Sequence, residues 1–221
     1  MNPELDERAA LLQDAARRVD GCRRCAIGSQ RRHAVFGEGN PYAELLLIGE
    51  APGESEDASA RPFIGRSGKL LEKMLATISL RREDVFITSI VKCRPTLPGP
   101  RGLKNRAPDA REIAHCRSYL DEQVEILQPR VILALGSLAA KSFLGKQTMI
   151  SKERGNWSQG PLGIPLMVTF HPAYLLRQTG GEIEAVKRLV GPDLHAVRAK
   201  LDEPSSNKSE RPVGIHAKIR G

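Results

Sequence analysis

Residues 45–71 constrain the fold of this chain more than any other stretch. They begin with the apolar run LLLI at 45–48, which is short and uninterrupted, as in a strand that is covered on both faces of a parallel sheet. The sequence GEAPG then ends the strand, because its glycines and proline are unfavourable inside one. Carboxylates follow at the carboxyl end of the strand, where open α/β sheets bind ligands. They are Glu50, Glu54, Glu56 and Asp57.

Phe63 adds an aromatic ring to the same segment, between Pro62 and Gly65. Apolar residues then recur at helical spacing over 69–78, so a helix is expected there. Residue types alone leave two interpretations open. The segment could be an acidic surface loop with one apolar anchor, or an active-site loop that combines a carboxylate with an aromatic platform.

The rest of the chain alternates between strand and helix patterns, after an amphipathic helix over 1–20. Four apolar runs have the length and composition of buried strands. They are 45–48, 85–91, 131–135 and 165–170. Each is followed by a helical pattern, which predicts an α/β fold of three layers, α/β/α, with a central four-stranded parallel sheet. The ends of these strands would bring Glu50, Ser89 and His171 to one edge of the sheet.

We expect one structured domain over residues 1–202. Residues 203–221 are basic and poor in apolar side chains, which predicts a disordered tail. Inside the domain, proline and glycine in 96–107 predict a mobile loop, and the polar segment 149–163 is expected to be irregular.

The net positive charge of the chain favours a polyanionic binding partner. The chain has 34 Lys and Arg against 26 Asp and Glu, a net charge of +8, and nucleic acid is the first candidate for such an excess. No apolar run approaches the length of a membrane span, and the N-terminus has no hydrophobic signal region. We therefore expect a cytoplasmic protein. We also expect a monomer, because nothing in the sequence suggests a larger assembly.

Four cysteines are present, at Cys22, Cys25, Cys93 and Cys116. Cytosolic cysteines are rarely paired in structural disulfides. The close pair Cys22 and Cys25 could belong to a metal site, but a zinc ribbon would normally show a second close pair. Their spacing by itself leaves open whether the four are metal ligands or unrelated buried residues.

Three features together resemble one known family: the run GEAPGESED with RPFIGRSGKLL, the run HPAYLLR at 171–177, and the four cysteines. They are similar to those of the family 4, iron–sulfur uracil-DNA glycosylases. The resemblance covers about residues 22–201. It implies a monofunctional repair enzyme that hydrolyses the N-glycosidic bond of uracil in single- or double-stranded DNA and leaves an abasic site. It also implies that the four cysteines hold a [4Fe–4S] cluster, for which thiolates are ordinary ligands.

The resemblance also assigns roles to individual residues. Glu50 would be the catalytic carboxylate, and His171 would stabilise the departing uracil anion. Phe63 would stack on the flipped base. The implied substrate-binding residues are Ala51, Phe63, Ser89 and Asn105. The implied DNA-contacting residues are Pro52, Gly53, Arg66, Ser67, Tyr174, Leu175, Leu176 and Arg177.

One position departs from the family. The second strand normally carries an asparagine in a context like ITNVVKC, whereas this chain has ITSIVKC and therefore Ser89. A hydroxyl cannot offer the fixed donor and acceptor of an amide. Two alternatives thus stay open: a glycosylase for another deaminated base, and a DNA-binding member of the fold without catalytic activity. A related branch traps its product on a histidine after this strand, but 96–107 holds none, so trapping is not expected.

Overall fold

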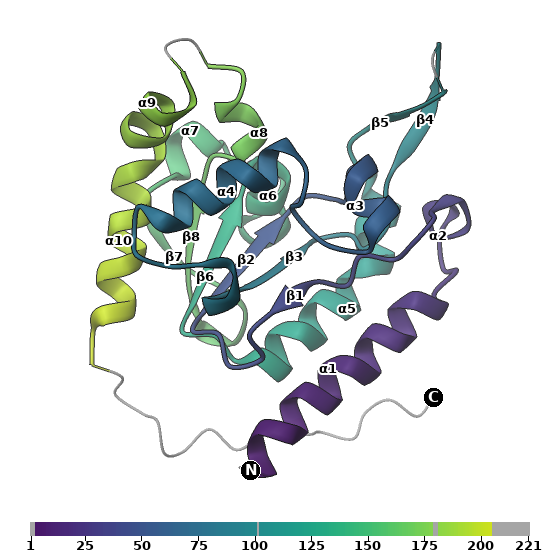
Figure 1. Cartoon of the computed structure of the whole chain (residues 1–221), viewed down its shortest axis with the longest axis horizontal. Coiled ribbons are helices and arrows are strands. Elements are labelled where there is room, and N and C mark those ends of the chain that lie inside the picture. The colour runs from purple at the N-terminus through teal and green to yellow at the C-terminus, as the bar shows by residue number, and fades with distance from the viewer. Residues whose placement is uncertain (1–2, 101, 179–180, 205–221) are drawn as a thin grey trace.

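The computed structural model describes residues 3–100, 102–178 and 181–204. Its centre is a six-stranded sheet with the strand order β1-β3-β2-β6-β8-β7 (Figure 1). The strands are β1 (Glu38–Gly39), β2 (Leu45–Gly49), β3 (Phe86–Ser89), β6 (Val131–Leu135), β7 (Trp157–Gln159) and β8 (Pro165–Thr169). The four central strands run parallel, as predicted, and the two edge strands pair antiparallel with their neighbours.

The two edge strands are additions to the sequence prediction. β1 has two residues and β7 has three, so neither is long enough to show the alternation that identifies a strand in a sequence. β7 lies inside the segment 149–163, whose polar composition predicts irregular structure.

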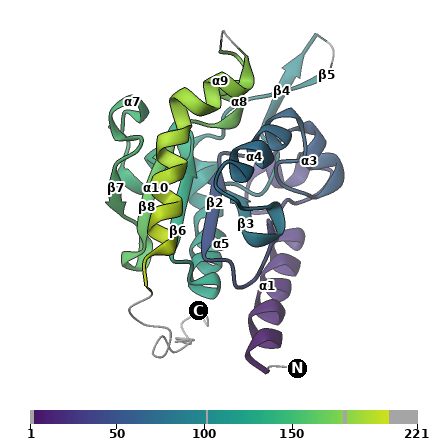
Figure 2. The same cartoon turned by 60° about the vertical axis from the view of Figure 1, so that its left-hand side comes forward.

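Helices cover both faces of the sheet, which gives the predicted three layers (Figures 1 and 2). One layer contains α4 (Arg66–Ala76), α8 (Pro172–Leu175), α9 (Glu182–Ala185), the π-helical turn η3 (Val186–Val190) and α10 (Gly191–Asp202). The other layer contains α1 (Pro3–Gly21), α5 (Ala110–Leu127) and α6 (Ser137–Leu144).

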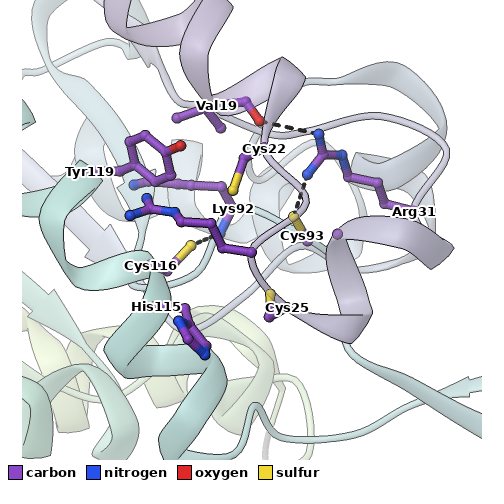
Figure 3. Close-up of a pocket in the computed structure, with 11 residues that line it drawn as sticks. Val19, Cys22, Cys25, Arg31, Lys92, Cys93, His115, Cys116 and Tyr119 are labelled. Atoms are coloured by element: carbon purple, nitrogen blue, oxygen red, sulfur yellow. Dashed lines mark hydrogen bonds between the residues drawn. The ribbon is translucent and has the colours of Figure 1, made fainter.

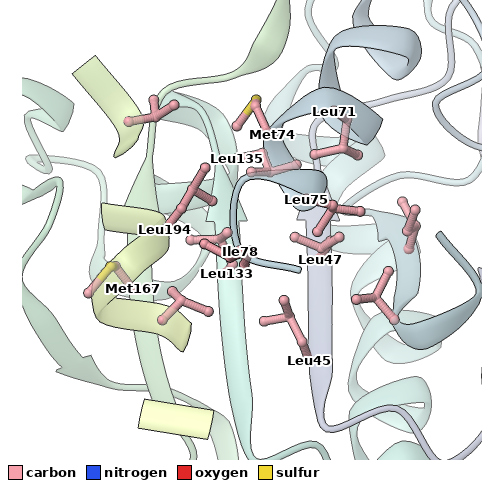
Figure 4. Close-up of a cluster of buried hydrophobic side chains, with 14 of the residues drawn as sticks. Leu45, Leu47, Leu71, Met74, Leu75, Ile78, Leu133, Leu135, Met167 and Leu194 are labelled. Carbon is pink, nitrogen blue, oxygen red and sulfur yellow. The ribbon is translucent and has the colours of Figure 1, made fainter. Parts of the chain in front are cut away.

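The core forms on both sides of β2. Leu45 and Leu47 face the first layer, while Leu46 and Ile48 face the second, and all four are at most 1% exposed. Figure 4 shows the first of these cores, where side chains of β2, β6 and β8 meet those of α4 and α10. The continuous apolar run therefore marks a strand buried on both faces, as the sequence predicts.

The remaining elements are short. They are the helices α2 (Ala26–Gln30), α3 (Glu54–Ser59) and α7 (Ile150–Glu153), and the 3-10 turns η1 (Arg82–Asp84) and η2 (Pro161–Gly163). β4 (Thr96–Gly99) and β5 (Gly102–Asn105) form an antiparallel hairpin. The segment 96–107, predicted to be a mobile loop, therefore contains two paired strands. They were not predicted because proline and glycine, here Pro98, Gly99 and Gly102, are unfavourable in strands.

The predicted tail, 203–221, lies outside the described residues from 205 onward. Within the described ranges, every helix is too short or too polar to cross a membrane.

Candidate active site and cysteine cluster

The candidate active site lies where the parallel strands β2, β3 and β8 end. Gly49 and Ser89 are neighbours in register on β2 and β3. Glu50 directly follows β2, and His171 comes shortly after β8. The ring of Phe63 crosses Gly49 so closely that a Cβ atom there would lie 2.5 Å from Phe63 Cζ and 3.4 Å from Ser89 Oγ. The structure thus brings these strand ends to one edge, as predicted.

Phe63 is held in a backbone conformation that few residues other than glycine adopt, with a φ of 50°. Its carbonyl oxygen accepts a hydrogen bond from Arg82 at 2.9 Å, and Arg82 also donates to the carbonyl of Pro62. Gly68 of α4 approaches the same Phe63 carbonyl, and a Cβ at Gly68 would lie 1.7 Å from it. Such locally strained positions concentrate at ligand-binding loops, where the surrounding structure maintains them.

Glu56 fastens the loop that carries Phe63. Its side chain is buried, and its carboxylate accepts backbone N–H groups from Gly53, Ile64 and Gly65, each at 3.1 Å. One carboxylate therefore joins the beginning of the loop to its end. Sequence reasoning grouped Glu56 with the carboxylates of a ligand site, but its oxygens are occupied by the protein backbone.

The other three carboxylates differ in their surroundings. Asp57 is buried and accepts the backbone N–H of Arg32 at 3.0 Å. Glu54 is exposed and forms an ion pair with Arg94 at 3.8 Å. Glu50 is half-buried at the end of β2, and burial raises the pKa of its carboxyl group above the ordinary value. Raised pKa values of this kind concentrate at functional sites.

His171 faces Phe63 from the opposite side of the site. The two rings are stacked, with centroids 5.5 Å apart and an interplanar angle of 29°. His171 Nδ1 accepts the backbone N–H of Ala173 at 3.0 Å, so the proton of the neutral ring is on Nε2. Burial, with the nearby charge of Arg177, lowers the pKa of His171 to about 4. The ring is therefore a neutral Nε2–H donor at physiological pH.

Asn105 lies beside the first loop of the site. Its Oδ1 accepts a hydrogen bond from Arg94 Nε at 2.7 Å, and its Nδ2 would be 3.5 Å from a Cβ atom placed on Gly53. The amide group is thus oriented by Arg94, which leaves its N–H donors for other contacts.

The residues predicted to contact DNA differ in accessibility. Arg66, Tyr174 and Arg177 are exposed, whereas Gly53, Ser67 and Leu176 are half-buried. Ala51, which is predicted to bind the substrate base, is also half-buried. Pro52 and Leu175 are buried, and Leu175 is 0% exposed within the core. Leu175 therefore presents no exposed surface in this structure, and its predicted DNA contact stays a prediction.

Sequence reasoning missed a buried network beneath α8. Asp193 of α10 accepts hydrogen bonds from Thr169 Oγ1 at 2.6 Å and from Arg154 at 2.9 Å. The guanidinium of Arg154 lies 5.3 Å from the ring centroid of Phe170, which stacks on Tyr174 at 4.6 Å. This network ties the exposed Tyr174 to α10 and to the end of β8. Local patterns could not reveal it, because its members come from separate elements.

All four cysteines line one small cavity between α1, α2 and α5 (Figure 3). Cys22 follows α1, Cys25 precedes α2, Cys93 follows β3 and Cys116 lies on α5. All are free thiols, and Arg31 donates to Cys93 Sγ at 2.9 Å. Burial raises the pKa of Cys93 to about 11, although Arg31 opposes the shift. Among the described residues, no group of three or more His, Cys, Asp and Glu side chains is arranged to hold a single metal ion.

A buried lysine connects this cavity to the active site. Lys92 Nζ donates to Thr88 Oγ1 at 2.6 Å, to the Ser89 carbonyl at 2.7 Å and to Gln123 Oε1 at 2.6 Å. Its backbone N–H donates to Cys116 Sγ at 3.3 Å. Three acceptors thereby surround the Lys92 nitrogen, whose pKa burial lowers to about 7, and the carboxyl end of β3 is fixed between the cysteines and the candidate site.

The sequence of this chain matches the model of a known protein family over the segment that forms the fold and the candidate site. Residues 36–195, most of the chain, match the uracil DNA glycosylase superfamily. The matched segment includes the strand ends that carry Glu50, Ser89 and His171. The match rests on the sequence, so it supports the class of protein separately from the contacts seen in the structure.

Individual relatives narrow the class. A type-4 uracil-DNA glycosylase of Thermotoga maritima is 41% identical over 196 residues, which cover 87% of this chain and 95% of the relative. A type-4 uracil-DNA glycosylase of Sulfurisphaera tokodaii is 40% identical over 173 residues, 75% of this chain and 76% of the relative. One of Archaeoglobus fulgidus is 38% identical over 175 residues, 75% and 83%. The chain belongs to the uracil DNA glycosylase superfamily and, within it, to the type-4 uracil-DNA glycosylases.

The depressed pKa of His171 predicts a pH dependence of stability. Between about pH 4 and 6.5 the unfolded chain binds a proton on this residue and the folded chain does not, so stability falls as the pH decreases through this range. The full contribution is about 3 kcal/mol. Urea unfolding of wild type and of His171→Asn, which keeps an acceptor for the N–H of Ala173, should therefore show a steeper pH slope for wild type. Equal slopes would contradict the lowered pKa of His171.

Proposed function

We propose that this chain is a DNA-repair enzyme that removes uracil from DNA by hydrolysing the N-glycosidic bond. The observation that carries the proposal is the convergence of Glu50, Phe63 and His171 at the carboxyl edge of the sheet, in a chain that belongs to the type-4 family. A half-buried carboxylate, an aromatic ring and a neutral N–H donor are the three groups that this reaction needs.

The chemistry follows from how charge develops. As the glycosidic bond breaks, the sugar becomes positive and the departing uracil becomes negative. The Glu50 carboxylate would stabilise the cation and orient the attacking water, and His171 Nε2–H would donate to uracil O2. A neutral donor suits this role, because the Nδ1 hydrogen bond to Ala173 holds the ring in one orientation before the charge appears.

The target base must leave the helical stack to reach these groups. Phe63 would stack on the flipped base, and Ala51, Ser89 and Asn105 would contact it. Contacts to the surrounding DNA are proposed for Pro52, Gly53, Arg66, Ser67, Tyr174, Leu176 and Arg177. The exposed arginines of this set would bind phosphates, which makes binding sensitive to salt.

Neutralising Glu50 tests the catalytic assignment. Glu50→Gln should reduce the excision rate by about 10²–10⁴-fold, because the neutral amide can neither stabilise the sugar cation nor accept a proton from water. The measurement is single-turnover excision from a uracil-containing single-stranded oligonucleotide, followed by alkaline cleavage and gel analysis. Glu54→Gln, an exposed carboxylate in the same loop, is the matched control and should stay near wild type. Equal loss in both variants would remove Glu50 from the mechanism.

A second candidate function, excision of another deaminated base, is favoured by Ser89. This buried hydroxyl at the end of β3 adjoins the Phe63 ring but cannot make the paired contacts of an amide. Because the remaining groups would act on any flipped base with a good leaving group, the range of bases depends on this position.

Restoring an amide should narrow the range of bases. Ser89→Asn should raise the preference for uracil over other deaminated bases by about tenfold or more, since a bidentate contact to a base edge contributes roughly 1–3 kcal/mol of discrimination. Ser89→Ala serves as the control for loss of the hydroxyl alone. Relative excision rates on a panel of oligonucleotides provide the measurement, and a selectivity unchanged by the asparagine would exclude Ser89 from base recognition.

We assign a [4Fe–4S] cluster to the four cysteines. Their side chains line one cavity although they come from three separate parts of the chain, which fits four thiolate ligands. Each thiolate of such a cluster binds a different iron, so the side chains need not converge on one point as they do around a single ion. When bound, the cluster would act as a cross-link between α1, α2, α5 and the end of β3. The chain's own contribution includes Arg31, which donates to Cys93 Sγ.

Iron content tests this assignment without reference to activity. The purified protein should contain iron and acid-labile sulfide in equal amounts and absorb visible light, and Cys116→Ala should lose most of both. His115→Ala is the matched control, because His115 lines the same cavity and should not be a ligand. Full iron content in the cysteine variant would contradict the ligand set.

We further propose that residues 1–202 form a single glycosylase domain, and that the protein is monomeric and cytoplasmic.

A further inference from the structure

The β4–β5 hairpin exposes apolar side chains away from the body of the molecule. Leu97 is 41% exposed and Leu103 is 57% exposed. Leu97 pairs with Lys104, and the adjacent pair is Pro98 with Leu103, so the two leucines lie on opposite faces of the ribbon. A two-stranded hairpin without a packed face is only marginally stable in water. These leucines therefore contribute little to the fold, and their exposure needs another explanation.

The base of the hairpin, by contrast, is firmly attached. Arg94 donates to Asn105 Oδ1 at 2.7 Å and to the carbonyl of Leu103 at 3.4 Å. Arg106 donates to the carbonyl of Thr96 at 3.1 Å and forms a two-point ion pair with the buried carboxylate of Glu112 at 2.7 and 2.5 Å. Two arginines thus connect both strands to the body, so the ribbon that carries Leu97 and Leu103 is held in place at its base.

The hairpin also stands beside the candidate active site. Its last residue, Asn105, lies next to Gly53, which belongs to the loop after β2. In both views of the molecule the hairpin projects at the same end as α8, which follows β8 and carries the exposed Tyr174 (Figures 1 and 2). A DNA strand that presents a flipped nucleotide to the site would therefore have α8 on one side and the hairpin on the other.

We infer that the hairpin is a second DNA-contacting element, in which Leu97 and Leu103 pack against the bases beside the flipped nucleotide and Lys104 binds a phosphate. Flipping exposes apolar base faces that are otherwise stacked, and apolar side chains commonly fill such gaps. The basic character of the chain, with a net charge of +8, also favours DNA as the occupant. The inference rests on the proposed uracil excision, because it presupposes a flipped nucleotide.

The leucines can be tested with a matched surface control. The double variant Leu97→Ser with Leu103→Ser is compared with Leu162→Ser, which removes a leucine that is 64% exposed in η2. On duplex DNA containing uracil, the double variant should raise KM by about tenfold while kcat changes little, since burying one leucine contributes about 1.5–3 kcal/mol. Leu162→Ser should leave both constants unchanged. Both variants should keep the wild-type Tm, because all three side chains are exposed.

A binding measurement separates this inference from the proposed function. Fluorescence anisotropy with duplex DNA that contains an abasic site gives a Kd without requiring catalysis, and the double variant should weaken it to a similar extent. In the same assay, Lys104→Ser should reduce the slope of log Kd against log salt concentration by about one. Unchanged KM and Kd in the double variant would overturn the inference. Absence of excision by wild type, with binding still dependent on the leucines, would instead refute the proposed function.

Discussion

The carboxylate of Glu56 is the interaction on which the candidate site depends. By accepting three backbone N–H groups it closes the loop that begins after β2, and so fixes where Phe63 stands. Charge-assisted hydrogen bonds of this kind are stronger than neutral ones and can hold an unfavourable backbone conformation. With Phe63 fixed, Gly49 must lack a side chain and His171 has a flat surface to stack on. Phe63, and with it the stacked ring of His171, is therefore positioned by a carboxylate whose oxygens bind the protein backbone.

Hydrogen bonds of Lys92 fix the position of the end of β3 from two sides. Lys92 donates to the Ser89 carbonyl on the side of the site, while its backbone N–H donates to Cys116 on the side of the cysteines. The position that we propose to contact the base and the wall of the cysteine cavity are thus held by one short segment of backbone, residues 89–92. A serine side chain at this point changes the contacts available to a base but leaves the strand geometry intact, because the hydrogen bonds that hold the strand involve its backbone.

Much of the fold could be predicted because it is encoded by local periodicity. The run at 45–48 is apolar at every position, which suits a strand between two helical layers, and 131–135 became β6 with the same bounds. The two strands within 96–105 were not predicted, because they lack such a local pattern. They contain Pro98, Gly99 and Gly102 and have no buried apolar face, so no apolar pattern marks them. The short edge strands and the 3-10 turns were not predicted, because elements of two or three residues are too short to show a periodic pattern of apolar residues.

By itself, the sequence determined the parallel α/β core, the order of its strands along the chain and the family motifs, since residue type and spacing are local properties. It also indicated that Glu50, Ser89 and His171 would meet, because carboxyl ends of parallel strands share one edge. Only the tertiary structure decided which polar groups are free to act. Glu56 faces the backbone and Leu175 the core, while His171 is neutral because packing removes water from it. Burial and hydrogen-bond partners come from residues distant in sequence, and these contacts exist only after the chain has folded.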